Sequence, residues 1–341
     1  MRYESLTKEL DEISKVIHLN NSILEGIMGE DKLIFKKSVH KNLIIEIYTF
    51  WENYVKKIMY NCYENYKKII VDREFIVNYI QQVQEKSYTR QLFLASLDEN
   101  KLNITIENLC YSNNLNYKEL NSLFKRLLFK VDDFNKHIDN HPALDRVINE
   151  LKLSGIDPVF KIVKSRYETS EYVEAYLNLL VENRNIVAHQ YELTDIYNLA
   201  QFEKIRDFVK ELADILYEYC GSQLIKKAKQ KSECIYKRFL PIKVIKGNSA
   251  GKTAIIGIRN ISLRKIGKDS KLYCYDKNKD IYRTLSIINL KKENKECNEI
   301  LPLESYSMEV YTNTSLNNKY KNFIIYDLDK RCDDYTYSII V

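Results

Sequence analysis

The first 238 residues contain only four glycines and two prolines, and this scarcity constrains the fold more than any other feature of the chain. Both residue types interrupt helices, so a stretch nearly free of them permits long helices. Apolar residues recur in it every three or four positions, as in NLIIEIYTFWENYVKKIMYNCYENY, and this spacing lines one face of a helix. We therefore expect an all-α domain over residues 1–238.

The apolar periodicity also indicates where the individual helices lie. Between the fourth and the fifth expected helix, the segment DDFNKHIDNHPALD is rich in polar residues, and we expect a polar connection there. The expected helices cover residues 3–26, 31–70, 74–97, 117–131, 142–153, 167–188 and 194–236.

The pattern changes after residue 238. Short runs rich in Ile, Tyr, Val and Thr, such as TAIIGI, KLYCYD, IYRTLSIINL and YSMEVYT, alternate with Gly, Asn, Asp and Lys. Such runs are typical of β-strands separated by turns. The sequence therefore predicts the α+β class: a helical bundle followed by a smaller, mainly antiparallel β domain over residues 239–341.

One segment of the β domain, GNSAGKT from Gly247 to Thr253, resembles a phosphate-binding loop. That loop needs four residues between its first glycine and the Gly-Lys pair, and a helix must follow. Here three residues intervene and the strand-like AIIGI follows, so we expect a hairpin turn.

The cysteines, the apolar runs and the net charge limit the classes of protein to which the chain can belong. The seven cysteines are odd in number and form no CxxC pair, so neither a disulfide framework nor a zinc site is expected, and reduced thiols suit the cytoplasm. No signal-peptide core and no uncharged apolar run of membrane-spanning length is present, so we expect a cytoplasmic protein without membrane segments. The net charge of +6 permits a polyanionic partner but does not identify one.

The segment VENRNIVAHQYE, residues 181–192, places an arginine, an asparagine and a histidine in an apolar helical run. On a helix, Arg184 falls on the apolar stripe, where a guanidinium is rarely left without a partner. His189 lies about 140° and Asn185 about 100° from Arg184. Either the helix ends near Ala188, or a second subunit completes a site.

Arginine and histidine suit RNA cleavage chemically. RNA carries its own nucleophile, the 2′-hydroxyl, so scission needs a group that moves a proton near neutral pH and a cation that stabilises the phosphorane. His189 supplies the first and Arg184 the second. No acidic cluster accompanies the segment, so neither a metal nor a cofactor is expected. The alternative is a paired core Arg184 and a helix-end His189 that interacts with the helix dipole.

The segment RNIVAHQY resembles the Arg-x4-6-His signature of the HEPN superfamily. Upstream, LIIEIYTFWENYVKKIMY is similar to the early helix of the RiboL-PSP-like HEPN families, in which an aromatic-Trp-Glu run precedes an aromatic residue and a lysine. The downstream segment DIYNLAQFEKIRDFVKELADILYEY suits the last helix of that fold. The resemblance covers the helical domain, about two thirds of the chain.

The resemblance implies a homodimer with a metal-independent endoribonuclease cleft at its interface. Arg184 would stabilise the scissile phosphate, His189 would be the general acid or base, and Asn185 would orient the phosphate or a neighbouring side chain. Glu52 matches the glutamate after the tryptophan and would support the arginine. Tyr191 extends the match to Arg-x4-His-x-Tyr. This longer motif is similar to that of HEPN toxins that are silenced by nucleotide attachment to the tyrosine. The alternative is that Tyr191 is a core residue.

Two further groups of side chains have spacings or charges that a binding site could use. His137 and His141 have a spacing that a metal site could use, but no third ligand is evident, and a polar turn accounts for them better. The basic run IKKAKQKSECIYKR could guide RNA phosphates toward the cleft, or it could be a solvated helix end. Its candidate RNA-binding residues are Lys226, Lys227, Lys229 and Lys231.

Together these features predict a metal-independent endoribonuclease that cleaves RNA by 2′-hydroxyl transesterification. HEPN domains often belong to bacterial toxin and phage-defence systems, so the resemblance implies an effector with an antitoxin or a defence-system partner. The alternative is a non-catalytic HEPN module that binds nucleotides or acts as a protein-interaction scaffold.

Overall fold

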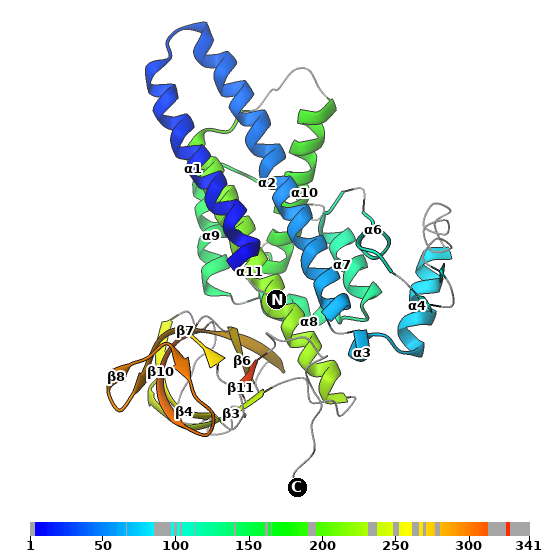
Figure 1. Ribbon diagram of the computed structural model, residues 1–341. Coiled ribbons are helices and arrows are strands. Elements are labelled where there is room, and N and C mark those ends of the chain that lie inside the picture. The colour runs from blue at the N-terminus through cyan, green and yellow to red at the C-terminus, as the bar shows by residue number, and fades with distance from the viewer. Residues whose placement is uncertain are drawn as a thin grey trace.

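The computed structural model of the chain describes residues 4–65, 67–84, 97–98, 101–102, 104–112, 114–139, 141–160, 163–164, 166–189, 196–230, 237–247, 252–260, 266–268, 271–276, 280–312 and 325–327. It contains a helical part, residues 4–230, followed by a sheet part, residues 237–327 (Figure 1). This order confirms the predicted α+β class. Across the described ranges, no helix is long and apolar enough to cross a membrane.

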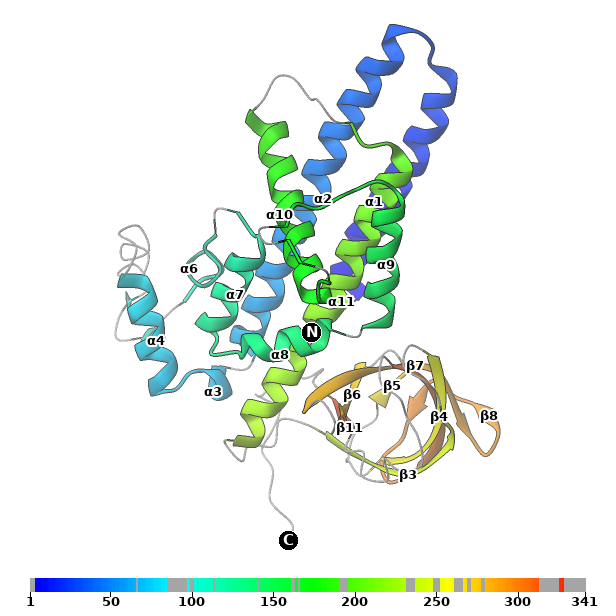
Figure 2. The same ribbon diagram turned by 180° about the vertical axis from the view of Figure 1, so that it is seen from behind.

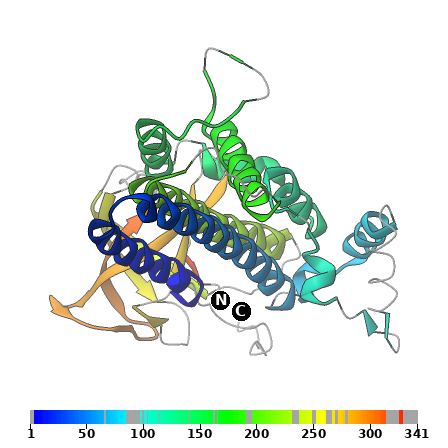
Figure 3. The same ribbon diagram turned by 90° about the horizontal axis from the view of Figure 1, so that it is seen from above.

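Three long helices form the centre of the helical part. Helices α1 (Glu4–Gly26) and α2 (Glu30–Asn65) form an antiparallel hairpin, and Gly29 between them has a φ of 66°. Helix α11 (Leu199–Gln230) packs against both (Figure 3). The side chains of Ile47, Trp51 and Ile58 on α2 are completely buried, as their helical spacing predicts.

Shorter helices surround this centre. Helix α10 (Thr169–His189) packs on α2, and α9 (Pro142–Leu153) packs on α11. Several begin at side-chain caps: for example, the Asn116 side chain accepts a hydrogen bond from the Glu119 amide, and Pro142 occupies the first turn of α9. The others are α3 (Lys67–Ile70), α4 (Arg73–Gln84), α6 (Ile106–Leu109), α7 (Tyr117–Arg126) and α8 (Val131–Ile138).

The predicted helices at 3–26, 142–153, 167–188 and 194–236 correspond to observed ones, and the single helix predicted for 31–70 is two helices, α2 and α3. Two other predicted ranges are too long. The helix predicted for 117–131 ends at Arg126, and Leu128 adopts a positive φ of 55°. The helix predicted for 74–97 ends at Gln84, and Leu97 lies in the short strand β1 (Leu97–Asp98), which pairs with β2 (Lys101–Leu102). Residues 85–96 lie outside the described ranges.

The polar connection predicted for residues 132–145 is wrong. Residues 131–138 form α8, which buries Phe134 and Ile138 in the core, and His137 is 0% exposed. His141 caps α9 by accepting a hydrogen bond from the Leu144 amide. The two histidines are therefore structural residues of the interior rather than a polar turn.

The sheet part is one antiparallel sheet that closes on itself (Figure 2). Its strand order is β10-β4-β3-β11-β6-β7-β8, and β10 also pairs with β7. Antiparallel pairing of β3 with β4 confirms the predicted hairpin, whose turn residues 248–251 lie outside the described ranges. The strands are β3 (Lys237–Lys246), β4 (Lys252–Asn260), β6 (Lys271–Asp276), β7 (Ile281–Lys292), β8 (Lys295–Glu296), β10 (Ser305–Thr312) and β11 (Ile325–Asp327).

Buried side chains alternate with less buried ones along the strands, and the buried ones form a second core inside this sheet. In β10, Tyr306, Met308 and Val310 are buried while the residues between them are not. Met308 lies opposite Ile256 on β4 and Leu290 on β7, and all three side chains are fully or almost fully buried. A separate short pair, β5 (Ile266–Gly267) with β9 (Glu299–Ile300), adds to this part. The five cysteines in the described ranges are free thiols.

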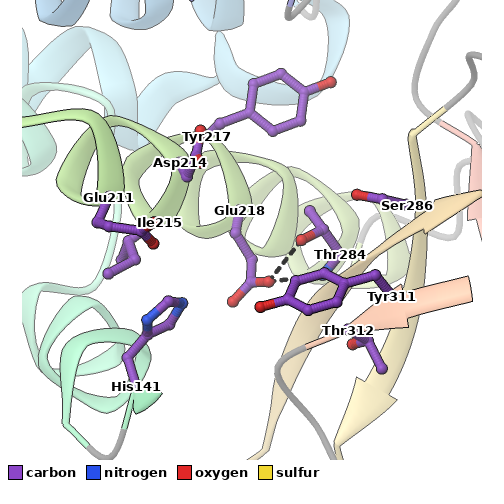
Figure 4. A pocket seen from close by; sticks show the side chains of 10 residues that line it. All are labelled: His141, Glu211, Asp214, Ile215, Tyr217, Glu218, Thr284, Ser286, Tyr311 and Thr312. Atoms are coloured by element: carbon purple, nitrogen blue, oxygen red, sulfur yellow. Dashed lines mark hydrogen bonds between the residues drawn. The ribbon is translucent and has the colours of Figure 1, made fainter. Parts of the chain in front are cut away.

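The sheet part is docked on α11 through buried polar contacts. Glu218 of α11 is 2% exposed and accepts hydrogen bonds from Arg283 Nη1 (2.7 Å) and the Thr284 amide (2.7 Å). Burial by itself would raise the pKa of Glu218, but Arg283 and His137 outweigh it and hold the pKa far below its usual range. Figure 4 shows Glu218 reaching from α11 toward Thr284, at the edge of a cavity of about 120 Å³ between the two parts.

Close packing reinforces this junction. A Cβ atom at position 221 would overlap the buried ring and hydroxyl of Tyr273, so any residue other than glycine would force that side chain to move. One residue later, the Ser222 hydroxyl accepts a hydrogen bond from the Tyr282 amide (3.0 Å). Lys226 Nζ bridges Asp133 of α8 (2.9 Å) and Asp280 of the sheet part (3.3 Å). The two parts are therefore joined by specific contacts as well as by the chain.

Candidate active site

Helix α10 carries the three residues predicted to act on RNA. It packs on α2, and its side chains of Val173, Leu177 and Leu180 are buried. Its C-terminal end lies at the end of the helical part that is remote from the sheet (Figures 1 and 2). Arg184 is half-buried there, and His189 is exposed on the last turn. Both side chains are thus reachable from solvent.

The Arg184 guanidinium is held between two neighbours. Its central carbon lies 5.1 Å from the ring centroid of Tyr48 on α2, which is cation–π distance, and Nη1 donates to the Asn185 side-chain oxygen at 2.9 Å. Tyr48 is 1% exposed, and its hydroxyl accepts a hydrogen bond from the Leu115 amide at 3.0 Å. Because Tyr48 is fixed in the core, it gives Arg184 a rigid support.

Glu52 lies one turn after Tyr48 on α2 but does not pair with Arg184 in the described part of the chain. Its carboxylate binds Lys56 Nζ at 2.6 Å. Burial most of all raises the pKa of Tyr48, the nearby Glu52 carboxylate adds to this, and Arg184 opposes it. Glu52 and Arg184 both lie near Tyr48, and the support of the arginine by Glu52 stays a prediction.

His189 lies away from this cluster. Helix α10 runs without a break through His189, so the angle of about 140° between the directions of Arg184 and His189 expected for an ideal helix applies. Among the described residues, His189 makes no hydrogen bond and no ion pair. A single chain therefore presents the cation and the imidazole on different faces of one helix end.

His40 of α2 binds the backbone at Tyr197, just before α11 begins. His40 is 2% exposed, and its Nδ1 accepts a hydrogen bond from the Tyr197 amide at 2.9 Å. Burial lowers the pKa of His40 to about 4, so it is neutral near pH 7 and can accept this bond. The Tyr197 hydroxyl accepts in turn from Asn183 Nδ2 at 3.0 Å, next to Arg184. Tyr191, another predicted site residue, lies outside the described residues.

Three of the predicted RNA-binding lysines, Lys226, Lys227 and Lys229, lie near the C-terminal end of α11, beside the sheet and remote from the C-terminal end of α10 (Figure 1). Lys226 takes part in the ion pairs of the junction, and Lys229 lies 5.0 Å from the ring centroid of Tyr282. Lys227 is half-buried, and Lys231 lies outside the described residues. The structure does not bring these lysines together with Arg184, and their role in RNA binding stays a prediction.

Tyr48 is the site residue that the sequence interpretation missed. It lies four positions before Glu52 and therefore on the same helix face, a signal that could have identified it. No group of three or more His, Cys, Asp or Glu side chains in the described ranges is arranged to hold a metal ion.

A comparison with family models matches most of the helical part. The model described as RiboL-PSP-HEPN matches residues 3–222, which is well over half of the chain. The matched range contains Tyr48, Glu52, Arg184 and His189 and ends within α11, before the first strand of the sheet part. No curated protein and no solved structure matches the chain.

Proposed function

The chain belongs to the RiboL-PSP-HEPN family, a family of proposed ribonucleases, and we propose that it is a metal-independent endoribonuclease. One observation carries the proposal: α10 presents a half-buried Arg184, supported by Tyr48, and a solvent-exposed His189 at one accessible helix end. An arginine buried and neutralised by a carboxylate would instead favour a structural role. The Arg184 guanidinium contacts a neutral ring and an amide, so its charge stays available for a phosphate.

The proposed reaction is an internal transesterification. The 2′-oxygen attacks the adjacent phosphorus, the bond from phosphorus to the 5′-oxygen breaks, and the products are a 2′,3′-cyclic phosphate and a 5′-hydroxyl. His189 acts as general acid or base, taking the proton of the 2′-hydroxyl or giving one to the departing 5′-oxygen. Arg184 stabilises the extra negative charge of the phosphorane, and Asn185 orients the guanidinium or the phosphate.

A homodimer with a composite site resolves the divergence of Arg184 and His189. Two copies whose α10 ends meet would place Arg184 of one chain near His189 of its partner. The family implies an RNA substrate and a dimer, and we propose this arrangement on that basis. Mixing the Arg184→Ala and His189→Ala proteins should then restore part of the activity, because a mixed dimer keeps one intact composite site.

We further propose that the protein is an effector of a bacterial toxin or phage-defence system, in the cytoplasm, with an antitoxin or defence-system partner that restrains it. A non-catalytic HEPN scaffold is the competing function.

The test is incubation of the purified full chain with transfer RNA and messenger RNA in EDTA. We expect cleavage to products with 2′,3′-cyclic phosphate ends and none at a 2′-deoxy position. His189→Ala should slow cleavage by about 10²–10⁴-fold, the usual contribution of a general acid or base. The control is His18→Ala, an exposed histidine of α1. Cleavage that depends on a divalent metal, or that persists in His189→Ala, contradicts the mechanism; no cleavage at all favours the scaffold.

Tyr48 is expected to act as a positioning residue for Arg184. Tyr48→Phe keeps the ring and should retain most activity, whereas Tyr48→Leu keeps bulk without a π-face. We expect Tyr48→Leu to lower kcat about tenfold, since a partly desolvated cation–π contact is worth roughly 1–2 kcal/mol. Steady-state kinetics and thermal unfolding of both variants check this. Equal kcat values for the two variants at equal stability would exclude the role.

A further inference from the structure

A second pocket lies on α10, toward its N-terminal end and away from Arg184. It has a volume of about 180 Å³ and lies between the segment that precedes α10 and the outer face of that helix. Ala175, whose side chain is only a methyl group, leaves room on the helix side. The lining includes Val159, Phe160, Tyr167, Glu174, Ala175 and Asn178.

One wall of this pocket is aromatic. The rings of Phe160 and Tyr167 stack with centroids 3.8 Å apart, and Tyr172 packs edge-on against Phe160 at 5.1 Å. Two lysines lie on these rings: Lys152 Nζ is 3.5 Å from the Tyr172 centroid, and Lys164 Nζ is 5.8 Å from that of Tyr167. Aromatic faces bordered by cations are the usual surface for the bases and backbone of a single-stranded nucleic acid.

The opposite wall offers groups that read a base edge. Asn178 has no hydrogen-bond partner in the described part of the chain, and its amide can both donate and accept. The Glu174 carboxylate can accept from an exocyclic amino group, as carboxylates do from cytosine N4. Glu171 is already bound to Lys164 at 2.5 Å. Carboxylates inside the pocket disfavour a phosphate there, whereas an uncharged base carries no such penalty.

The position along α10 connects this pocket to the proposed active site. Asn178 and Asn185 are seven residues apart, so they lie on the same helix face, two turns or about 10 Å from each other. An RNA strand whose phosphate reaches Asn185 and Arg184 can therefore extend along α10 toward the pocket.

We infer that the pocket walled by Phe160, Tyr167 and Asn178 is a nucleobase subsite for single-stranded RNA. This inference rests on the proposed function for its substrate class. The base lies between the aromatic wall and α10 and is read by Asn178 and Glu174. Lys152 and Lys164 lie beside the strand's phosphates. Because the carboxylate accepts from amino groups, bases that carry one, such as cytosine, bind better than uracil.

The test measures binding rather than cleavage, so that it remains decisive if the protein is not a nuclease. Fluorescence anisotropy with labelled oligocytidine and oligouridine RNA is followed in EDTA, with the full chain carrying His189→Ala. Ala175→Leu fills the pocket and Asn178→Ala removes the free amide. Each is expected to weaken oligocytidine binding about tenfold, which lies within the range measured for the loss of one stacked base.

Leu153→Ala is the matched control, because Leu153 is 88% exposed at the end of α9 and is not part of the pocket. Asn178 lies on the helix surface, so its variant tests the subsite even if Ala175→Leu fails to fold. Affinity of both pocket variants within twofold of the control overturns the subsite, and so does an equal loss for oligouridine and oligocytidine. Reduced oligocytidine binding without any cleavage by the unmutated chain would instead overturn the proposed nuclease and leave the subsite standing.

Discussion

Arg184→Ala is expected to reduce the cleavage of RNA in EDTA by at least about 100-fold, because losing one donor to a developing oxyanion costs on the order of 10²–10³ in kcat. The side chain stands on the α2 face of α10, and its charge is not neutralised by a carboxylate in the described part of the chain. The loss should therefore appear in kcat rather than in KM. Single-turnover kinetics with a labelled RNA measure it directly.

Arg184→Lys distinguishes charge from shape. An ammonium keeps the positive charge but lacks the planar fork that stacks on Tyr48 and binds two phosphate oxygens, so only part of the activity should return. Arg206→Ala is the matched control, since Arg206 is a half-buried arginine of α11 that binds the neighbouring Asp207. Unchanged kcat in Arg184→Ala, or an equal loss in Arg206→Ala, would show that Arg184 does not act on the phosphate.

The largest stability effect is expected at the junction of the two parts. Arg283→Met leaves the carboxylate of Glu218 buried without its main counter-charge, and breaking a buried pair in this way typically costs 3–5 kcal/mol, so a loss of about that size is expected. Glu218→Gln in the same chain removes the stranded charge, and the double variant should recover part of the stability. Urea unfolding measures all three proteins.

The chain supplies both a control and a local probe for this experiment. Lys292 and Glu304 form a solvent-screened surface pair at 2.7 Å, and Lys292→Met should leave the urea midpoint almost unchanged. The only tryptophan, Trp51, is buried in the helical part, so its fluorescence reports that part alone. If Arg283→Met unfolds at the same urea concentration as the unmutated chain, the buried pair does not hold the parts together.

Secondary structure could be predicted for most of the chain because one face of each long element is apolar. The apolar stripe that includes Val173, Leu177 and Leu180 predicted the existence of α10, and all three side chains are buried. The β-rich run YSMEVYT likewise predicted β10, and the structure places Tyr306 and Met308 inside the sheet. These patterns depend on neighbours along the chain, so a single sequence contains them.

The errors occurred where polar residues are buried by distant partners. Asp133 and His137 made α8 look like a loop, yet Asp133 binds Gln223 and Lys226, and His137 binds Glu218, more than eighty residues away. Burial of a polar group is tolerated only when such partners exist, and local sequence does not show them.

Part of the candidate site could likewise be predicted from the sequence, and part could not. The sequence by itself determined that Arg184 and Asn185 lie on one helix with an apolar stripe, because spacing is a local property, and it left open whether that helix reaches His189. Only the tertiary structure decided that Tyr48 lies against Arg184 and that Glu218 joins the bundle to the sheet. The physical reason is that these contacts depend on how helices pack and on which buried charges meet, and packing brings together residues that are far apart in sequence.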